Sequence, residues 1–284
     1  MGMAASNSAS EFNEFKKRLK LLISKNPYLI TLTLSNIFTM RLLGNKTHGD
    51  LAEVGITEFV NQYMYDYKAL HVGKDLFRSK EHEEDIQVIS EISNAKIPIS
   101  LKAYGDGPLQ LSTDKAGEMF PLLKSMGSKI SSSTDIGAVL KSQPFVTTSG
   151  LHILPLIYSE GNKKCNIMVF DYERAFSDVK LIELADSGNG RKHPVYRFTG
   201  RNGNYIFEVR YGGASANALQ RGLWTHTKNA LPYFDSVTDG WIDYSHNLVL
   251  VELFSHALVT NEAGHSAALI KLKSSIESIK KGIQ

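Results

Sequence analysis

Two short apolar runs joined by a polar turn constrain the fold of this chain more than any other feature. The first run is Glu83–Ile89, with acids at its start, and the second is Ile97–Tyr104, with Ser90–Lys96 between them. Short runs rich in isoleucine and valine and bounded by polar residues are typical of β-strands. Two strands linked by so short a turn pair as an antiparallel hairpin, so the chain must contain a sheet built around this pair.

Helical patterns lie on both sides of a region rich in strand patterns. We expect helices over 14–25, 30–40, from Thr47 to Tyr63, within 116–141, over 216–230 and over 267–281. We expect further strands over 109–113, 151–158, 165–172, 180–184, 195–198 and 205–211; the apolar run 248–258 fits either type. This order favours an α/β or α+β fold with a mixed central β-sheet flanked by helices.

The length of 284 residues allows one large domain or two small ones. Residues 1–12 are small and polar, and we expect a disordered lead or a scar left by cloning there. We find no internal repeat or low-complexity tract. We therefore expect a single domain over 13–284.

The chain carries no sequence signal for a membrane or for secretion. No apolar run approaches the roughly 20 residues that span a bilayer, and the N-terminus lacks a basic segment followed by an apolar one. The single cysteine, Cys165, excludes an internal disulfide, and we expect it to be buried in a strand without a nucleophilic role. We therefore expect a cytoplasmic protein that does not contact a membrane.

The total charge conceals an uneven distribution. The net charge is only +3, which neither requires nor excludes nucleic acid. Residues 191–228 carry seven basic residues and one acid, whereas residues 229–265 carry five acids and no Lys or Arg. The first segment can present a positive field to DNA, or the acidic segment can fold back and neutralise it.

The hairpin carries residues suited to metal-dependent phosphodiester hydrolysis. That chemistry needs oxygen ligands for a divalent ion and positive charge near the scissile phosphate. Asp85 can supply a metal-binding carboxylate and Lys102 the charge, and Ser100 shares a strand face with Lys102 because alternate residues do. In the simpler alternative the acids are solvated turn residues and Lys102 is an ordinary exposed lysine.

This arrangement resembles the PD-(D/E)XK nucleases, and more narrowly their type II restriction endonucleases. The stretch Lys102–Ser112 also resembles sequence from restriction enzymes. The resemblance implies a restriction-endonuclease-like fold with a catalytic part over about 47–115, in which Asp85 is the first acid and Lys102 the motif lysine. It implies that Glu53 is the glutamate of the preceding helix, with Glu58 as the fallback.

One position departs from the family pattern. Ser100 stands where the family usually has Asp or Glu, and serine is a poor metal ligand. The second metal carboxylate must then come from outside the triplet; Glu84, Glu53 and Glu58 are the candidates, and we expect Glu53. Gln110, one strand later, can touch the attacking water or the phosphate.

A second dense segment, Phe207–Thr227, resembles the specificity part of restriction endonucleases. Arg, Asn and Gln side chains can pair with base edges, and Thr, His and Lys suit phosphates. The candidate DNA-binding residues within about 191–228 are Arg191, Lys192, Arg201, Arg210, Asn217, Gln220, Arg221, Thr225, His226, Thr227 and Lys228. Structural alternatives exist: Asn217 can cap a helix, Arg221 can bridge to the acidic tail, and Trp224 can belong to the core.

Together these resemblances imply a Mg²⁺-dependent type II restriction endonuclease. Such an enzyme would cut double-stranded DNA at a short specific site within a restriction-modification system. A homodimer is expected because a palindromic site matches a two-fold axis. The alternative is a non-catalytic DNA-binding or assembly protein in which the hairpin is purely structural.

Overall fold

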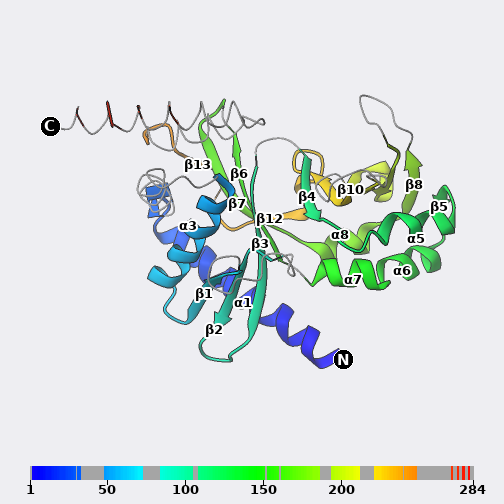
Figure 1. Cartoon of the computed structure of the whole chain (residues 1–284), viewed down its shortest axis with the longest axis horizontal. Coiled ribbons are helices and arrows are strands. Elements are labelled where there is room, and N and C mark those ends of the chain that lie inside the picture. Colours follow the sequence, from blue (N-terminus) through cyan, green and yellow to red (C-terminus); the bar gives the residue numbers. More distant parts are fainter. Residues whose placement is uncertain are drawn as a thin grey trace. The chain divides into compact units, whose positions relative to one another are not determined.

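The computed structural model describes most of the chain, in two compact units where we expected one domain. The described residues are 2–29, 31–32, 48–72, 84–104, 108–150, 152–159, 161–185, 193–211, 221–238, 240–247, 270, 274, 277–278 and 281. Unit 1 comprises Met1–Gly105, Leu154–Met168 and Ser236–Gln284, and unit 2 comprises Asp106–Ile153 and Val169–Asp235. The combination of helices and sheets confirms the predicted α+β class (Figure 1).

The first sheet contains the predicted hairpin and lies mostly in unit 1. Its order is β1-β2-β3-β6-β7-β12, with β13 paired to β7. The strands are β1 (Tyr67–His71), β2 (Ile86–Ser90), β3 (Lys96–Tyr104), β6 (His152–Ser159), β7 (Lys164–Phe170), β12 (Phe234–Ser236) and β13 (Ile242–Asp243). β1, β2 and β3 form an antiparallel meander, so the hairpin expected from the sequence is present.

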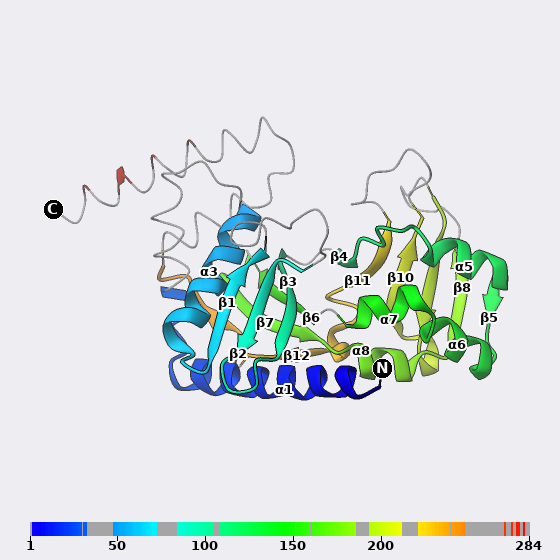
Figure 2. The same cartoon turned by 60° about the horizontal axis from the view of Figure 1, so that its bottom comes forward.

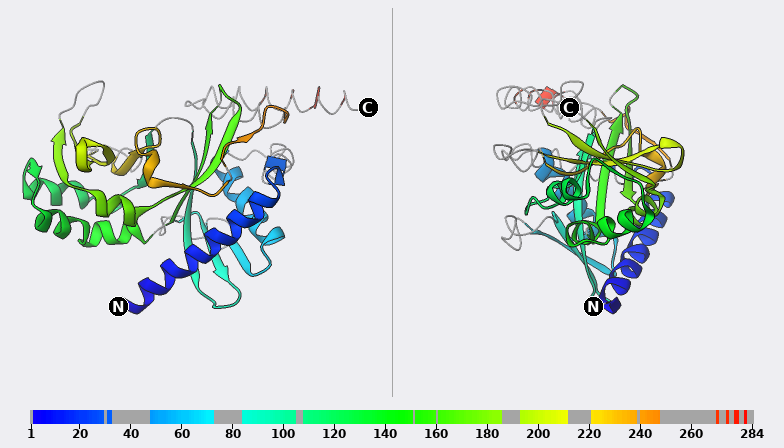
Figure 3. Two further views of the ribbon diagram at one scale, coloured as in Figure 1. Left: turned by 180° about the vertical axis from the view of Figure 1, so that it is seen from behind. Right: turned by 90° about the vertical axis from the view of Figure 1, so that its right-hand side faces the viewer.

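Helix α1 (Gly2–Lys25) covers one face of this meander. Its buried stripe is Phe12, Phe15, Leu19 and Ile23, at the spacing of one side of a helix. The ring of Phe15 packs edge-on to Tyr67 of β1, with centroids 5.2 Å apart. Figure 2 shows α1 running along beneath β1, β2 and β3, and the left panel of Figure 3 shows it crossing these strands.

The beginning of α1 differs from our expectation. The helix starts at Gly2, so residues 2–12 are helical where we expected a disordered lead. Phe12 is buried, with its ring 6.3 Å from that of Phe15, and this contact extends the apolar stripe by one turn. Alanine and serine tolerate a helix that such packing already stabilises.

Helix α3 (His48–Tyr63) packs against β1 and β3. Val54, Ile56, Phe59 and Val60 are buried on the predicted apolar face. Asn61 fastens the helix to β1, because its amide donates to the Ala69 carbonyl (3.0 Å) and its amide oxygen accepts from the Ala69 N–H (2.8 Å). This pair of hydrogen bonds holds α3 in register with the strand beside the hairpin.

The second sheet belongs to unit 2 and has the order β4-β11-β10-β9-β8-β5. Its strands are β4 (Pro108–Ser112), β5 (Lys129–Ile130), β8 (Leu181–Ala185), β9 (Val195–Thr199), β10 (Tyr205–Arg210) and β11 (Gly222–His226). Helices α5 (Met119–Met126), α6 (Ser133–Leu140), α7 (Gln143–Ser149) and α8 (Tyr172–Asp178) gather along one side of it (Figure 2). Rings from α7 and α8 pack on Phe198 and Phe207, so this side forms the core of unit 2.

Most predicted strands and the helices within 116–141 are confirmed, but two elements differ. The predicted strand 165–172 ends at Phe170, because the Asp171 carboxylate accepts a hydrogen bond from the Arg174 N–H and begins α8. The predicted helix 216–230 is wrong, since Gly222–His226 form β11. Pairing of Trp224 with Glu208 and Gln110 on either side outweighs the local helical pattern. Residues 33–47 and 248–258, and most of 267–281, lie outside the described residues.

Within the described residues, no helix combines the length and apolar character needed to cross a bilayer. Unit 2 also contains two short 3₁₀ turns, Arg201–Gly203 and Leu231–Tyr233.

Gly222 provides a test of the strand assignment for β11. Its φ is +91°, and a Cβ there would lie 2.1 Å from the Ser112 carbonyl oxygen of β4. We expect Gly222→Ala to lower the free energy of unfolding by about 3 kcal/mol or more, because backbone strain and a backbone clash add.

The control is Gly203→Ala. Gly203 also has a positive φ, +73°, but a Cβ there meets nothing within 4 Å. Its cost should be only about 1–2 kcal/mol from the left-handed backbone. Urea denaturation of both variants compares the two values; equal costs would contradict the close approach of β11 to β4.

Candidate active site

The register of the hairpin places Asp85 beside Ser100. Ile86 of β2 stands opposite Ile99 of β3, and the Asp85 N–H donates to the Ile99 carbonyl (3.0 Å). Asp85 therefore lies one residue before β2, next to the segment of β3 that carries Ser100 and Lys102. The predicted strand positions of these three residues agree with this arrangement.

The Asp85 carboxylate is held by three groups from β3. Its Oδ2 accepts hydrogen bonds from Ser100 Oγ (2.9 Å) and from the Leu101 N–H (2.7 Å). Lys102 Nζ lies 3.6 Å from the same oxygen. Among the described residues, every contact to this carboxylate falls on Oδ2, so Oδ1 remains available to a ligand.

The Asp85–Lys102 pair is partly open to solvent. The side chains are 23% and 31% exposed, whereas Ser100 is buried. A separation of 3.6 Å is an ion pair without a good hydrogen bond. The Lys102 ammonium therefore keeps donors for a second anion, while the buried Ser100 hydroxyl and the Leu101 amide fix the orientation of the carboxylate.

Glu53 of α3 contacts a histidine that the sequence reasoning missed. Glu53 Oε2 lies 2.9 Å from His71 Nε2, and both side chains are largely buried. His71 ends β1, and the N–H of the next residue, Val72, donates to the Asp85 carbonyl (2.9 Å). His71 is thus on the strand whose backbone continues beside Asp85, and Glu53 reaches it from α3. The apolar residues Tyr67 and Ala69, which alternate with Lys68, were the sequence signal for this strand.

The other candidate acids are placed less favourably. Glu58 is exposed on α3, and Glu84 is half-buried next to Asp85 in the chain. Within the described part of the chain, no three His, Cys, Asp or Glu side chains lie close enough to hold a metal ion together. The described site therefore contains one carboxylate held by hydrogen bonds, at Asp85. Glu53 contacts His71, which stands opposite Ile86 and so shares a sheet face with Ile86 rather than with Asp85.

This donor set fits Mg²⁺ chemically. Mg²⁺ usually binds proteins through one or two carboxylates and fills its remaining positions with water and substrate phosphate oxygens. Asp85 Oδ1 can make such a contact from a partly exposed position. Cys165, by contrast, is buried in β7, and burial raises the pKa of its thiol to about 12, which disfavours a thiolate.

Gln110 and residues 191–228, which contain the candidate DNA-binding residues, lie in unit 2. Gln110 is on β4, and its Nε2 donates to the Arg221 carbonyl (2.9 Å). Arg221 in turn donates to the Lys115 carbonyl (2.8 Å). Gln110 therefore supports the chain where it enters β11. The predicted contacts of Gln110 with water or phosphate stay a prediction.

Arg210 is anchored within the second sheet. Its Nε lies 2.7 Å from Oε1 of the buried Glu208, and its guanidinium carbon lies 4.2 Å from the centre of the Trp224 ring. A buried carboxylate of this kind depends on its cation, because an unpaired buried charge is costly. Arg210 therefore has a structural partner on each side.

Two predicted DNA-binding residues face the interior. Thr225 and Thr227 are buried, and the Thr225 hydroxyl donates to the Ile206 carbonyl (2.7 Å). Their place on the core side of the second sheet removes both from contact with phosphates. His226 is half-buried, while Lys228 and Arg201 are exposed. Arg191, Lys192, Asn217 and Gln220 lie outside the described residues.

The face of the second sheet opposite its helices carries a row of aligned, mostly polar residues in which Trp224 and Glu208 are buried. Cross-strand pairing aligns Gln110, Trp224, Glu208, Arg197, Glu183 and Lys129. Lys129 Nζ contacts Glu183 Oε1 at 3.0 Å. Within the described residues, the exposed Arg197 makes no ion pair, and the same holds for Arg201 and Lys228. Arg197, Arg201 and Lys228 are thus exposed bases of residues 191–228 that have no carboxylate partner in the described part of the chain.

Ser100 provides a structural test of the site. Ser100→Ala removes a buried donor to Asp85 Oδ2, so we expect the free energy of unfolding to fall by about 1–2 kcal/mol. Ser93→Ala, in the exposed turn of the same hairpin, is the control and should change it by less than about 0.5 kcal/mol. Equal effects in thermal or urea denaturation would show that Ser100 does not hold the carboxylate.

No family model matches this chain, and comparisons with curated proteins and with solved structures gave no match.

Proposed function

We propose that this protein is a Mg²⁺-dependent type II restriction endonuclease that cuts double-stranded DNA at a short specific site. One observation carries the proposal: a carboxylate, a hydroxyl and an ammonium from Asp85, Ser100 and Lys102 meet at one end of a hairpin. The helix that precedes this sheet brings Glu53 to the neighbouring strand. The same residues support the resemblance to PD-(D/E)XK nucleases.

In the proposed reaction a water oxygen attacks phosphorus, and the bond from phosphorus to the leaving oxygen breaks. Asp85 and Glu53 would hold the metal through carboxylate oxygens. When bound, Mg²⁺ supplies Lewis-acid activation of water and stabilises charge on the leaving oxygen. Lys102 places its positive charge beside a phosphate bound near Asp85, and Ser100 with the Leu101 amide holds Asp85 in one orientation.

Glu53 is the second metal carboxylate in this proposal. Its Oε2 is paired with His71 in the structure described here, so His71 is the residue that orients it. A histidine that donates to a ligand carboxylate restricts its rotation, which is the usual role of groups behind a metal ligand. This pairing supports Glu53 over the exposed Glu58.

DNA recognition is assigned to Arg197 on the face of the second sheet opposite its helices, to the turn that follows β9 and to Lys228 after β11. Arg197, Arg201 and Lys228 are exposed bases, and Arg210 at the end of β10 is anchored to Glu208. Phosphate contacts from such residues position a protein on DNA, while paired hydrogen bonds to base edges select the sequence. We further propose a homodimer, acting in the cytoplasm as part of a restriction-modification system.

The catalytic assignment is tested by two substitutions. We expect Asp85→Asn and Lys102→Ala each to slow plasmid cleavage in Mg²⁺ by about 100-fold or more, because each removes charge at the reacting phosphate. Binding to the same DNA, measured in Ca²⁺ by fluorescence anisotropy, should remain. Lys96→Ala removes another lysine of β3, exposed and outside the site, and should cleave normally.

Two results would contradict the assignment in different ways. Failure of the unmodified protein to cut any DNA, in Mg²⁺ with a broad set of plasmids, would leave the non-catalytic DNA-binding or assembly role. Cleavage that survives both substitutions would retain a nuclease but move its active site away from the hairpin.

The recognition surface is tested by salt dependence. We expect Arg197→Ala and Arg201→Ala each to weaken DNA binding and to reduce the slope of log affinity against log salt by about 1. Lys124→Ala, on α5 at the core side of the second sheet, is the matched control and should leave the slope unchanged. Unchanged slopes for both arginine variants would place DNA on a different surface.

A further inference from the structure

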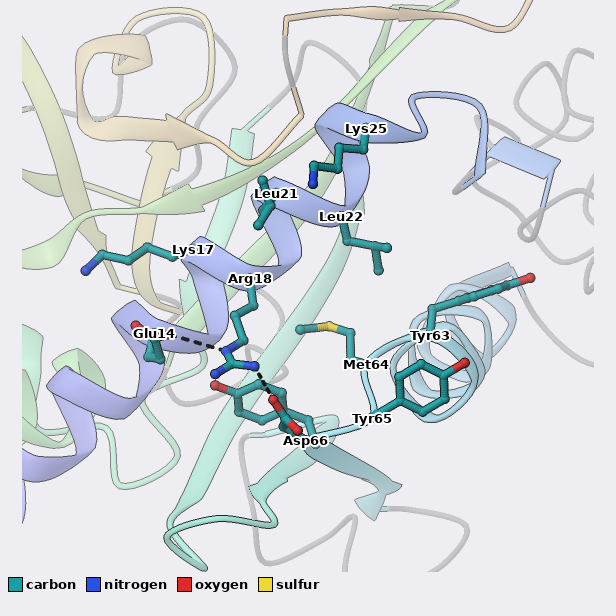
Figure 4. Close-up of a pocket in the computed structure, with 11 residues that line it drawn as sticks. Glu14, Lys17, Arg18, Leu21, Leu22, Lys25, Tyr63, Met64, Tyr65 and Asp66 are labelled. Atoms are coloured by element: carbon teal, nitrogen blue, oxygen red, sulfur yellow. Dashed lines mark hydrogen bonds and ion pairs between the residues drawn. The ribbon is translucent and has the colours of Figure 1, made fainter.

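A groove in unit 1 lies apart from the residues of the proposed active site. It runs between α1, from Glu14 to Lys25, and the turn that joins α3 to β1, Tyr63–Tyr67, and its volume is about 540 Å³. In Figure 4, Leu22 and Met64 lie between Arg18 and Tyr63, and Lys25 lies beyond Leu22 along the helix. The volume falls within the range of binding sites in proteins.

An ion pair holds the two walls together. Arg18 of α1 contacts Asp66 in the turn, and its Nε lies 3.3 Å from Glu14 Oε1 (Figure 4). The contact joins segments that are 48 residues apart in the chain. Arg18 pairs with Glu14 and Asp66, the two acids that line the groove. Neither acid therefore neutralises Lys17 or Lys25.

The groove exposes apolar surface. Leu21 is 56% exposed and Tyr65 87%, while Met64 between the walls is buried. Exposed apolar residues gathered at one groove, rather than scattered singly, mark a surface that another molecule covers. Tyr65 is of a residue type that is enriched at the energetic centres of interfaces.

Uncompensated positive charge surrounds this apolar surface. Over Glu11–Lys25, α1 carries five basic residues and two acids. Lys17 and Lys25 both line the groove, and within the described residues neither makes a hydrogen bond or an ion pair. They stand four residues before and four after Leu21, so a cation lies one helical turn from it on either side.

We propose that this groove binds an acidic amphipathic helix from a partner protein, a role beyond cleavage of DNA. The wall from Glu14 to Lys25 is about 16 Å long at 1.5 Å per residue, which matches about three turns of a helix. Such a ligand presents apolar anchors at i, i+3 or i+4, and i+7 to Leu21, Leu22 and Tyr65. Its acids face Lys17 and Lys25. A DNA phosphate backbone would pair with Lys17 and Lys25 but would leave Leu21 and Leu22 in contact with solvent.

The test uses a designed 12-residue probe with leucines at these spacings and glutamates elsewhere, labelled with fluorescein. We expect saturable binding to the full chain by fluorescence anisotropy. A second probe with the same leucines but lysines in place of glutamates should bind at least about tenfold more weakly, because like charges then meet at the groove.

Matched substitutions locate the binding. We expect Lys25→Glu and Tyr65→Ser each to weaken the acidic probe by about fivefold to tenfold. Lys20→Glu reverses an exposed lysine of α1 that does not line the groove, and Ile92→Ser removes a 73% exposed side chain at the β2–β3 turn. Both controls should bind as the unmodified protein does.

Several outcomes would overturn the proposal. No binding of the acidic probe, equal binding of both probes, or equal losses in the groove and control variants would each do so. Loss of duplex DNA binding in Lys25→Glu, with the peptide unaffected, would make the groove a nucleic-acid surface. A dimer that Leu21→Asp dissociates, measured by light scattering, would make a second copy its occupant.

Discussion

The pairing of β2 with β3 in a single register is the interaction on which the rest of unit 1 depends. With Ile86 opposite Ile99, one face of the meander buries isoleucine and valine side chains beneath α1. A slip of one residue would turn every side chain of the strand to the other face. The same register sets Asp85 beside Ser100, so the strand pairing that forms the core also forms the candidate site.

Polar contacts then orient the side chains that this strand pairing places close together. Asn61 bonds both backbone groups of Ala69 and so fastens α3 to β1. Glu53 reaches His71 from that helix, and the β3 backbone holds Asp85 through Leu101. Each contact joins a side chain to a neighbouring element, and together they limit how far the candidate catalytic groups can turn. In unit 2, the contacts of Arg210 with Glu208 and Trp224 restrict the Arg210 side chain in the same way.

The accuracy of the sequence reasoning differed between elements for physical reasons. The hairpin and β4, β6, β8, β9 and β10 were predictable because their alternation or apolar runs are local. β11 was missed because its residues carry a helical pattern, and only pairing with β4 and β10 makes a strand of Gly222–His226. β1 and His71 went unrecognised because a short alternating stretch after a helix is a weak signal. The burial of Thr225 and Thr227 could not be predicted from residue type, because threonine occurs on both the buried and the exposed faces of strands.

By itself, the sequence determined the α+β class, the hairpin and the shared face of Ser100 and Lys102, because these follow from periodicities of a few residues. The resemblance to PD-(D/E)XK nucleases added the prediction that a carboxylate from outside the Ser100–Lys102 triplet completes a metal site. Only the tertiary structure decided that Glu53 meets His71, that Gln110 supports Arg221, and that Arg18 joins α1 to the turn before β1. Those pairs lie from 18 to 111 residues apart in the chain, and only packing of whole elements selects them from the many partners a charged or amide side chain can take.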